Sequence, residues 1–182
     1  MSDLNWKICH SEYIHKGPWA TLRNDKCEMP DGRIVDEYFV LEYPNWVNAV
    51  AITEENKVLM VRQYRHAANI ISLEIPGGVI DGDEGPENAM RRELLEETGY
   101  RFDEMEQLCI IYANPSTANN HTYCYLAKGG KKVQEPVLDE HEDLIVEEYT
   151  IAEVKQLLIN NNIAQALHCT ALFYALIKLG EL

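Results

Sequence analysis

Three glutamates close together in one stretch, Glu93, Glu96 and Glu97, are the residues of this chain whose types and spacing are best suited to chemistry. On an α-helix, residues three and four positions apart share a face, so Glu93 would lie beside both of the others. Three stacked carboxylates repel one another in water unless cations neutralise them. Mg²⁺ is such a cation, because proteins usually hold it by a few carboxylates together with waters and substrate phosphates. The spacing therefore predicts a helix whose acidic face binds divalent metal ions.

A longer pattern surrounds these glutamates. Gly78 is followed after five residues by Glu84, and after seven more by the run 92–97, which leads to Gly99 and Tyr100. This pattern resembles the signature of the Nudix hydrolase family, and the resemblance covers about residues 16 to 175. The alternative is an amphipathic helix with a solvated acidic face and Gly99 as its C-terminal cap. That alternative explains the helix but leaves the glycine loop before it unexplained.

The order of the expected elements indicates the fold class. Pro86 can begin a helix, because its missing N–H costs nothing at the first helical position, and Gly99 can end it. Strands are expected at 19–23, 34–41, 47–52, 58–64, 72–75, 108–112, 121–126 and 144–149, and helices at 86–98, 152–159 and 163–179. This order predicts an α+β protein with a mixed β-sheet between helices, which is also the Nudix fold that the resemblance implies. We expect a small N-terminal β-sheet subdomain at residues 1–44 and a Nudix hydrolase domain at residues 45–182.

Composition narrows the functional classes. The chain has 182 residues, 46% of them apolar and 25% charged, as is ordinary for a globular protein of one domain. No apolar run approaches the about 20 residues that span a bilayer, and the N-terminus lacks the features of a signal peptide, so we expect a cytoplasmic location. The formal net charge of −14 argues against nucleic-acid binding. The five scattered cysteines form no Cys-x-x-Cys pair, which argues against a zinc site or a disulfide framework.

The resemblance to the Nudix family also implies a metal site. Glu93, Glu96 and Glu97 would ligate two or three Mg²⁺ or Mn²⁺ ions, and the backbone carbonyl of Gly77 would complete the shell. Hydrolysis of a pyrophosphate requires neutralised phosphate charge, an activated water and a base for its proton. The metal ions bound by these ligands would supply the first of these requirements.

The remaining catalytic roles are less narrowly defined by the sequence. Arg92 lies four residues before Glu96 and can orient a carboxylate, or it can form an ordinary surface ion pair. Glu84 would lie near the metals or order the loop. The general base varies within the family, and the segment 139–143 lies where the ADP-ribose-cleaving subgroup carries it. Glu140 and Glu142 are the candidates, and a solvated charge cluster is the alternative.

Features outside the signature resemble ADP-ribose and related nucleoside-diphosphate-sugar pyrophosphatases. These are the stretches 59–65 and 73–78, together with Pro115, which lies near the place of a marker proline in that subgroup. Arg65 would hold a phosphate, although an arginine at a strand end is as often structural. The chain departs from the subgroup in its Pro-Gly-Gly turn, where Pro-Ala-Gly is commoner, and in residues 116–120. The sugar of the substrate is therefore less well defined than its diphosphate.

The N-terminal region adds a possible base-binding surface. Residues 16–19 resemble the corresponding part of these enzymes, in which a small β-domain helps to build a homodimer and aromatic side chains stack on adenine. Trp19 is the first candidate for stacking and Tyr38 the second, with core packing as the alternative role for both. The resulting hypothesis is a Mg²⁺-dependent hydrolase of ADP-ribose. A hydrolase of another sugar nucleotide such as GDP-mannose, and a non-catalytic nucleotide-sugar sensor, are the alternatives.

Overall fold

The computed structural model describes residues 4–18, 20–140 and 142–182, and the chain divides into two units. The first unit contains residues 1–44 and 112–120, and the second contains residues 45–111 and 121–182. Within the first unit, the hydroxyl of Tyr38 donates a hydrogen bond to the backbone carbonyl of Ser116 at 2.8 Å. The loop 112–120 is thus attached to the N-terminal strands.

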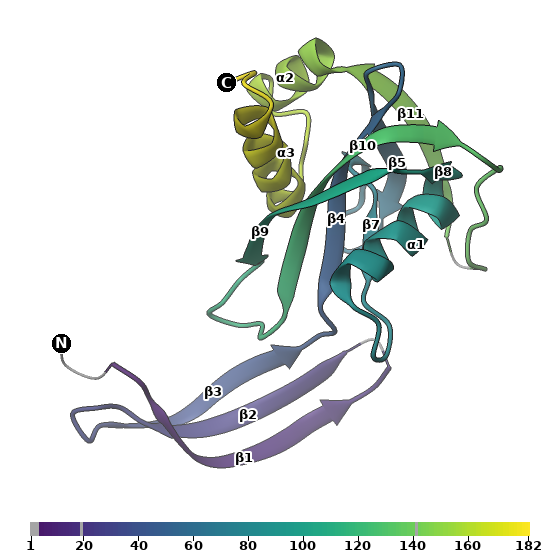
Figure 1. Cartoon of the computed structure of the whole chain (residues 1–182). Coiled ribbons are helices and arrows are strands. Elements are labelled where there is room, and N and C mark those ends of the chain that lie inside the picture. The colour runs from purple at the N-terminus through teal and green to yellow at the C-terminus, as the bar shows by residue number, and fades with distance from the viewer. Residues whose placement is uncertain (1–3, 19, 141) are drawn as a thin grey trace. The chain divides into compact units, whose positions relative to one another are not determined.

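The first unit is built on an antiparallel sheet of three strands in the order β1-β2-β3 (Figure 1). These strands are β1 (Lys7–Lys16), β2 (Thr21–Glu28) and β3 (Ile34–Glu42). Every residue of β1 is exposed. A strand exposed on both faces needs no alternation of apolar and polar residues, which is why the sequence did not predict β1.

The second unit contains eight strands and three helices within the described residues. The strands are β4 (Trp46–Thr53), β5 (Lys57–Arg65), β6 (Ile70–Glu74), β7 (Gly77–Val79), β8 (Tyr100–Arg101), β9 (Glu104–Tyr112), β10 (His121–Lys132) and β11 (Leu144–Thr150). The sheet runs in the order β11-β5-β4-β10-β8, while β6, β7 and β9 pair with β5, β4 and β10. β10 pairs with β4 in parallel. The pairs β10–β8, β11–β5, β4–β5, β4–β7 and β5–β6 are antiparallel, so the sheet is mixed as predicted.

Helices cover both faces of this sheet. They are α1 (Pro86–Thr98), α2 (Ile151–Ile159) and α3 (Ala166–Lys178). Figure 1 shows α1 on one face and α2 with α3 on the other. Alternate residues of β4 face opposite ways: Ala49 packs in the cluster that contains Met90 of α1, whereas Val50 packs in the cluster that contains Leu172 of α3. The predicted layering of helices, sheet and helices is therefore confirmed.

The bounds of α1 agree with those predicted from the sequence. Pro86 begins the helix, and Gly99 ends it in the left-handed region with φ 78°. The N–H of Gly99 bonds to the carbonyl of Leu95 at 2.9 Å, and a Cβ at this position would lie 2.1 Å from the carbonyl oxygen of Gln134. Glycine is therefore required for both conformation and space.

The other two helices were predicted less closely. α3 begins at Ala166 rather than at Ile163, because Gln165, the residue before it, has extended backbone with φ −92° and ψ 125°. Ile163 is nevertheless buried in the core.

All five cysteines are free thiols. Within the part of the chain that the structure describes, no helix has the length and apolar character needed to cross a membrane.

Candidate active site

Two of the predicted metal-ligating carboxylates, on α1, contact the glycine turn that follows β6. The N–H of Gly77 donates to Glu97 Oε2 at 3.0 Å. Gly78 packs so closely against Glu93 that an added Cβ would lie 2.3 Å from Glu93 Oε1. β7 pairs with β4 through Gly77 opposite Asn48, which fixes the turn to the central sheet. The carboxylates of Glu93 and Glu97 therefore lie directly against the glycine turn.

Arg92 lies at the centre of a network that joins the helix to the preceding loop. Its Nη1 donates to Glu93 Oε1 and to Glu96 Oε2, both at 2.9 Å. Its Nη2 donates to Glu84 Oε1 at 2.7 Å and to the carbonyl of Val79 at 2.9 Å. One guanidinium thus orients three carboxylates, which is more than an isolated surface ion pair does. Glu84 is held at the loop end of this network.

Burial controls the protonation of the two carboxylates beside the turn. Burial raises the pKa of Glu93 to about 7, although the neighbouring Arg92 opposes this shift. Glu97 is only 4% exposed, and burial, followed by the charge of Glu93, raises its pKa well above the usual range. Two adjacent acids that are costly to ionise are stabilised as anions when a cation binds between them.

The donor set fits a hard divalent cation. All the candidate ligands are oxygens, from carboxylates and from the backbone of the turn, as Mg²⁺ and Mn²⁺ prefer. No three of the described histidine, cysteine, aspartate and glutamate side chains converge as a direct metal cage. Mg²⁺ does not require such a cage, because it keeps several waters and binds through one or two carboxylates. Glu93 and Glu97 could provide such a pair. Arg92 donates from one nitrogen to both Glu93 and Glu96, which holds the Glu96 carboxylate beside that of Glu93.

The acidic segment 139–143, before β11, contains both candidates for the general base, Glu140 and Glu142, and their surroundings differ. The N–H of Asp139 donates to Glu142 Oε2 at 3.2 Å, and the N–H of Glu142 donates to the carbonyl of Asp139 at 3.0 Å. Burial is the largest cause that raises the pKa of Glu93 and of Glu97, and the charge of Glu142 adds to both shifts. Among the described groups, Glu140 is not one of the main contributors. The charge of Glu142 thus acts on both α1 carboxylates, which favours Glu142 over Glu140 as the candidate base. His141 lies outside the described residues.

Arg65 is engaged in an ion pair that the sequence had left open as a structural alternative. Its Nε donates to Glu74 Oε1 at 3.0 Å and its Nη2 donates to Glu74 Oε2 at 2.6 Å. Glu74 is only 1% exposed, whereas the side chain of Arg65 is 45% exposed. The hydrogen bonds to Glu74 raise the pKa of Arg65, and Glu97 and Glu142 contribute further. The guanidinium is therefore fixed by Glu74 near the acidic residues and keeps one exposed side.

Two residues of this network were not identified from the sequence. Glu74 lies in the stretch 73–78, which drew attention only through its resemblance to the pyrophosphatases. The second is His168 on α3, whose Nδ1 accepts a hydrogen bond from the N–H of Ile75 at 3.0 Å. A glutamate between two apolar residues of the short strand predicted at 72–75 is a weak signal for a paired acid, because glutamate is almost never fully buried without a partner. A lone histidine on an apolar helix gives no comparable signal.

The remaining predicted residues belong to the first unit. The hydroxyl of Tyr38 bonds to Ser116, the neighbour of Pro115, and its ring contacts that of Trp6 at a centroid distance of 5.9 Å in an edge-to-face arrangement. Tyr38 and the loop of Pro115 are thus brought together. Trp19 lies outside the described residues.

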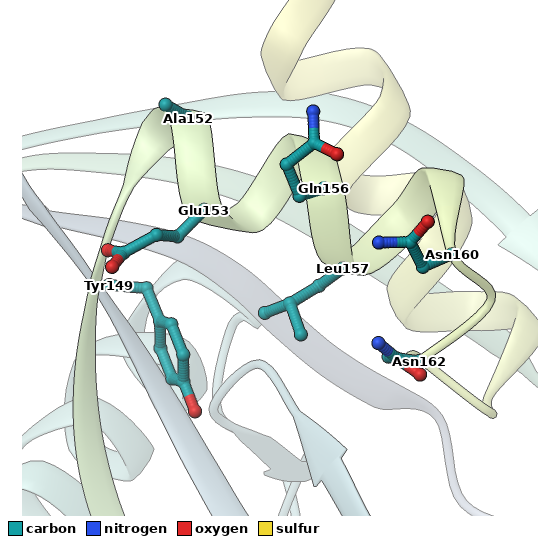
Figure 2. Close-up of a pocket in the computed structure, with 7 residues that line it drawn as sticks. All are labelled: Tyr149, Ala152, Glu153, Gln156, Leu157, Asn160 and Asn162. Atoms are coloured by element: carbon teal, nitrogen blue, oxygen red, sulfur yellow. The ribbon is translucent and has the colours of Figure 1, made fainter.

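A cavity of about 380 Å³ lies elsewhere, along α2 and the residues just before and after it (Figure 2). Its lining residues are Tyr149, Ala152, Glu153, Gln156, Leu157, Asn160 and Asn162. The Glu153 carboxylate accepts hydrogen bonds from the N–H and the hydroxyl of Thr150, so it caps the helix. None of the α1 carboxylates lines this cavity, which is therefore separate from the candidate active site.

Comparison with known proteins defines the class. A model of the NUDIX domain matches residues 43–170, and a model of the nucleoside diphosphate sugar hydrolase N-terminal domain matches residues 6–41. This chain therefore belongs to the Nudix family and is a Nudix hydrolase, as the sequence pattern predicted. Members of the family generally use a divalent metal.

Several relatives are similar over most of their length. A methanol dehydrogenase activator of Bacillus methanolicus is 36% identical, covering 82% of this chain and 81% of the relative. An ADP-ribose pyrophosphatase of Bacillus subtilis is 30% identical, covering 98% and 96%. A GDP-mannose pyrophosphatase of Yersinia enterocolitica is 29% identical, covering 91% and 92%. A crystal structure of an ADP compounds hydrolase matches all of both chains with a TM-score of 0.86 at 22% identity, which confirms the fold.

Proposed function

We propose that this protein hydrolyses the pyrophosphate bond of ADP-ribose to give AMP and ribose 5-phosphate, with Mg²⁺ or Mn²⁺ as cofactor. The observation that carries this proposal is the pair of buried carboxylates, Glu93 and Glu97, held against the Gly77–Gly78 turn. The similarity to ADP-ribose pyrophosphatases over nearly the whole chain supports the choice of substrate.

The residues of α1 and of the turn would hold the cofactor. Glu93, Glu96 and Glu97 are the proposed side-chain ligands, with the backbone carbonyl of Gly77. Arg92 orients Glu93 and Glu96 through its Nη1 and thereby fixes the angle at which they present their oxygens. A bound divalent cation supplies positive charge to the diphosphate and lowers the pKa of a nearby water.

Two further residues complete the proposed chemistry. The Glu142 carboxylate accepts a proton from the attacking water, with Glu140 as the other candidate in the same segment. The water oxygen forms a bond to one phosphorus, and the bond between that phosphorus and the bridging oxygen breaks. The exposed side of Arg65 contacts a phosphate while Glu74 holds the other side. The products are two phosphate monoesters.

We propose that the first unit takes part in dimerisation and in base recognition. β1 is exposed along its whole length, and Ile8 and Ile14 are each 55% exposed. An exposed strand at a sheet edge that carries such apolar side chains among its polar ones can pair with a second copy of the chain. Tyr38 and the Pro115 loop, which are hydrogen-bonded neighbours, are the proposed adenine contacts together with Trp19.

The second candidate substrate is another sugar nucleotide, GDP-mannose. The similarity to the GDP-mannose pyrophosphatase of Yersinia enterocolitica favours it. Residues 116–120 depart from the ADP-ribose subgroup in sequence, which leaves the sugar less well defined than the diphosphate. The test is phosphate release, coupled to a phosphomonoesterase, from ADP-ribose, GDP-mannose and other sugar nucleotides, with Mg²⁺ and with EDTA. Preference for ADP-ribose that EDTA abolishes is the expected result. Preference for GDP-mannose would keep the proposed chemistry but change the assigned substrate. Tight binding without turnover would indicate a sensor.

A further inference from the structure

A buried chain of polar contacts connects α3 to the glycine turn. His168 lies on α3 and is 6% exposed. Its Nδ1 accepts from the N–H of Ile75 at 3.0 Å, and its Nε2 lies 3.5 Å from Glu74 Oε2. Glu74 in turn accepts two hydrogen bonds from Arg65. One imidazole thus contacts two consecutive residues of the segment that leads into the turn.

The contacts of His168 define its tautomer. Because Nδ1 accepts a hydrogen bond, the proton of the neutral ring lies on Nε2, which faces the Glu74 carboxylate. Burial lowers the pKa of His168 to about 4, although Glu74 opposes this shift, so the ring is neutral at pH 7. The imidazole therefore accepts a hydrogen bond from the backbone through Nδ1 and places Nε2 3.5 Å from the carboxylate of Glu74.

The hydrogen bond from Ile75 to His168 matters for the turn because of where Ile75 lies in the sequence. Pro76 follows and has no N–H, so the backbone N–H groups on either side of it belong to Ile75 and Gly77. The first donates to His168 and the second donates to Glu97. The Pro76 carbonyl accepts from the N–H of Ala49 at 3.0 Å. The turn is therefore fixed by α3, by α1 and by the central strand β4.

We propose that His168 is a positioning residue for the metal site: from α3 it holds residues 74–77 so that Gly77 and Arg65 face the carboxylates of α1. This inference rests on the proposed function. His168 itself touches neither the substrate nor the metal. It acts through Glu74, which fixes the guanidinium of Arg65, and through Ile75, which fixes the turn. Outer partners of this kind typically change metal affinity or activity by about 10- to 100-fold when they are removed.

Substitutions at His168 can separate its two contacts. His168→Leu keeps bulk but removes both the hydrogen bond from Ile75 and the contact of Nε2 with Glu74. His168→Asn can place an acceptor near the position of Nδ1 and thus keep the bond to Ile75, whereas His168→Gln reaches the position of Nε2 and keeps the contact with Glu74. Leu172→Val is the matched control, because Leu172 is buried on the same helix, one turn further on, and lies in the core.

The experiment measures Mn²⁺ affinity by the electron paramagnetic resonance signal of free Mn²⁺, urea unfolding, and kcat and KM for ADP-ribose. We expect His168→Leu to weaken Mn²⁺ binding by at least about tenfold and to lower kcat, with Asn restoring most of the affinity. Leu172→Val should unfold at lower urea but bind Mn²⁺ as the wild type does. If His168→Leu does not fold, the test is the difference in Mn²⁺ affinity between His168→Asn and His168→Gln.

Two results would overturn the inference. The first is that folded His168→Leu binds Mn²⁺ as tightly as the wild type does, or that His168→Asn and His168→Gln both do. The other is an equal loss of affinity in Leu172→Val, which would reduce His168 to a general contribution to stability. Failure of the wild type to hydrolyse any sugar nucleotide would refute the proposed function alone, because the Mn²⁺ measurement does not depend on turnover.

Discussion

Replacing Gly78 by alanine would add one methyl group directly in front of the Glu93 carboxylate. The added Cβ would lie 2.3 Å from Glu93 Oε1 and 2.6 Å from Oε2, whereas ordinary contacts of a Cβ begin at 3.4 Å. The carboxylate must therefore retreat by about 1 Å, and a displacement of about 1 Å at a reacting site can cost about 100-fold in rate. The backbone need not move, because the obstructing atoms are the end of a flexible side chain.

The expected outcome is therefore a loss of activity without a comparable loss of stability. Gly78→Ala should lower kcat for ADP-ribose by about 100-fold, or about 3 kcal/mol of activation free energy. The free energy of unfolding should change by no more than about 1 kcal/mol, because a small strain can be relieved by rotation of Glu93. The assays are steady-state phosphate release and urea unfolding of the same preparations.

Two other glycines serve as comparisons. Gly85 precedes α1 and has open space around it, so Gly85→Ala should keep wild-type turnover. At Gly77 a Cβ would lie 2.3 Å from the backbone oxygen of Val47, so Gly77→Ala should cost about 1 to 3 kcal/mol of unfolding free energy. Wild-type kcat in Gly78→Ala would refute this reasoning. So would a loss of stability in Gly78→Ala as large as that in Gly77→Ala.

The remaining predictions concern the base and the response to pH. Glu142→Gln should lower kcat by about 100-fold with little change in KM, while Glu140→Gln changes kcat much less; equal small effects would remove this segment as the source of the base. The folded-state pKa of His168 is depressed to about 4 from 6.5, so between these values the unfolded chain binds more protons and stability falls as pH falls. That loss should approach about 3 kcal/mol of unfolding free energy by pH 4. The free energy of unfolding of His168→Asn, measured in urea, should depend less on pH than that of the wild type. Parallel pH curves for the two proteins would contradict the depressed pKa of His168.

Much of the site was predictable from the sequence because its signals are local. Pro86 and Gly99 mark the ends of α1 through backbone properties that do not depend on the rest of the fold. The face shared by Glu93 and Glu97 follows from helical periodicity alone. These signals gave the bounds of the helix and the side of it that meets the turn.

The parts that the sequence did not predict depend on distant contacts. His168 and Ile75 are 93 residues apart in the chain, and nothing near either residue indicates the other. The pairing of Arg65 with Glu74 was left open because a strand-end arginine serves phosphate binding and structural pairing equally well. β1 escaped prediction because its exposure on both faces leaves no periodic pattern.

Whether the carboxylates of α1 hold the metal for pyrophosphate cleavage is tested by comparing wild type with Glu97→Gln. Turnover of ADP-ribose is measured across a Mg²⁺ titration, with EDTA as the zero point. Loss of a ligand from a metal-assisted reaction predicts a kcat at least about 100-fold lower at saturating Mg²⁺ in the variant. The wild type should have no turnover in EDTA. Near wild-type turnover in Glu97→Gln, or turnover that EDTA does not affect, would contradict the assignment.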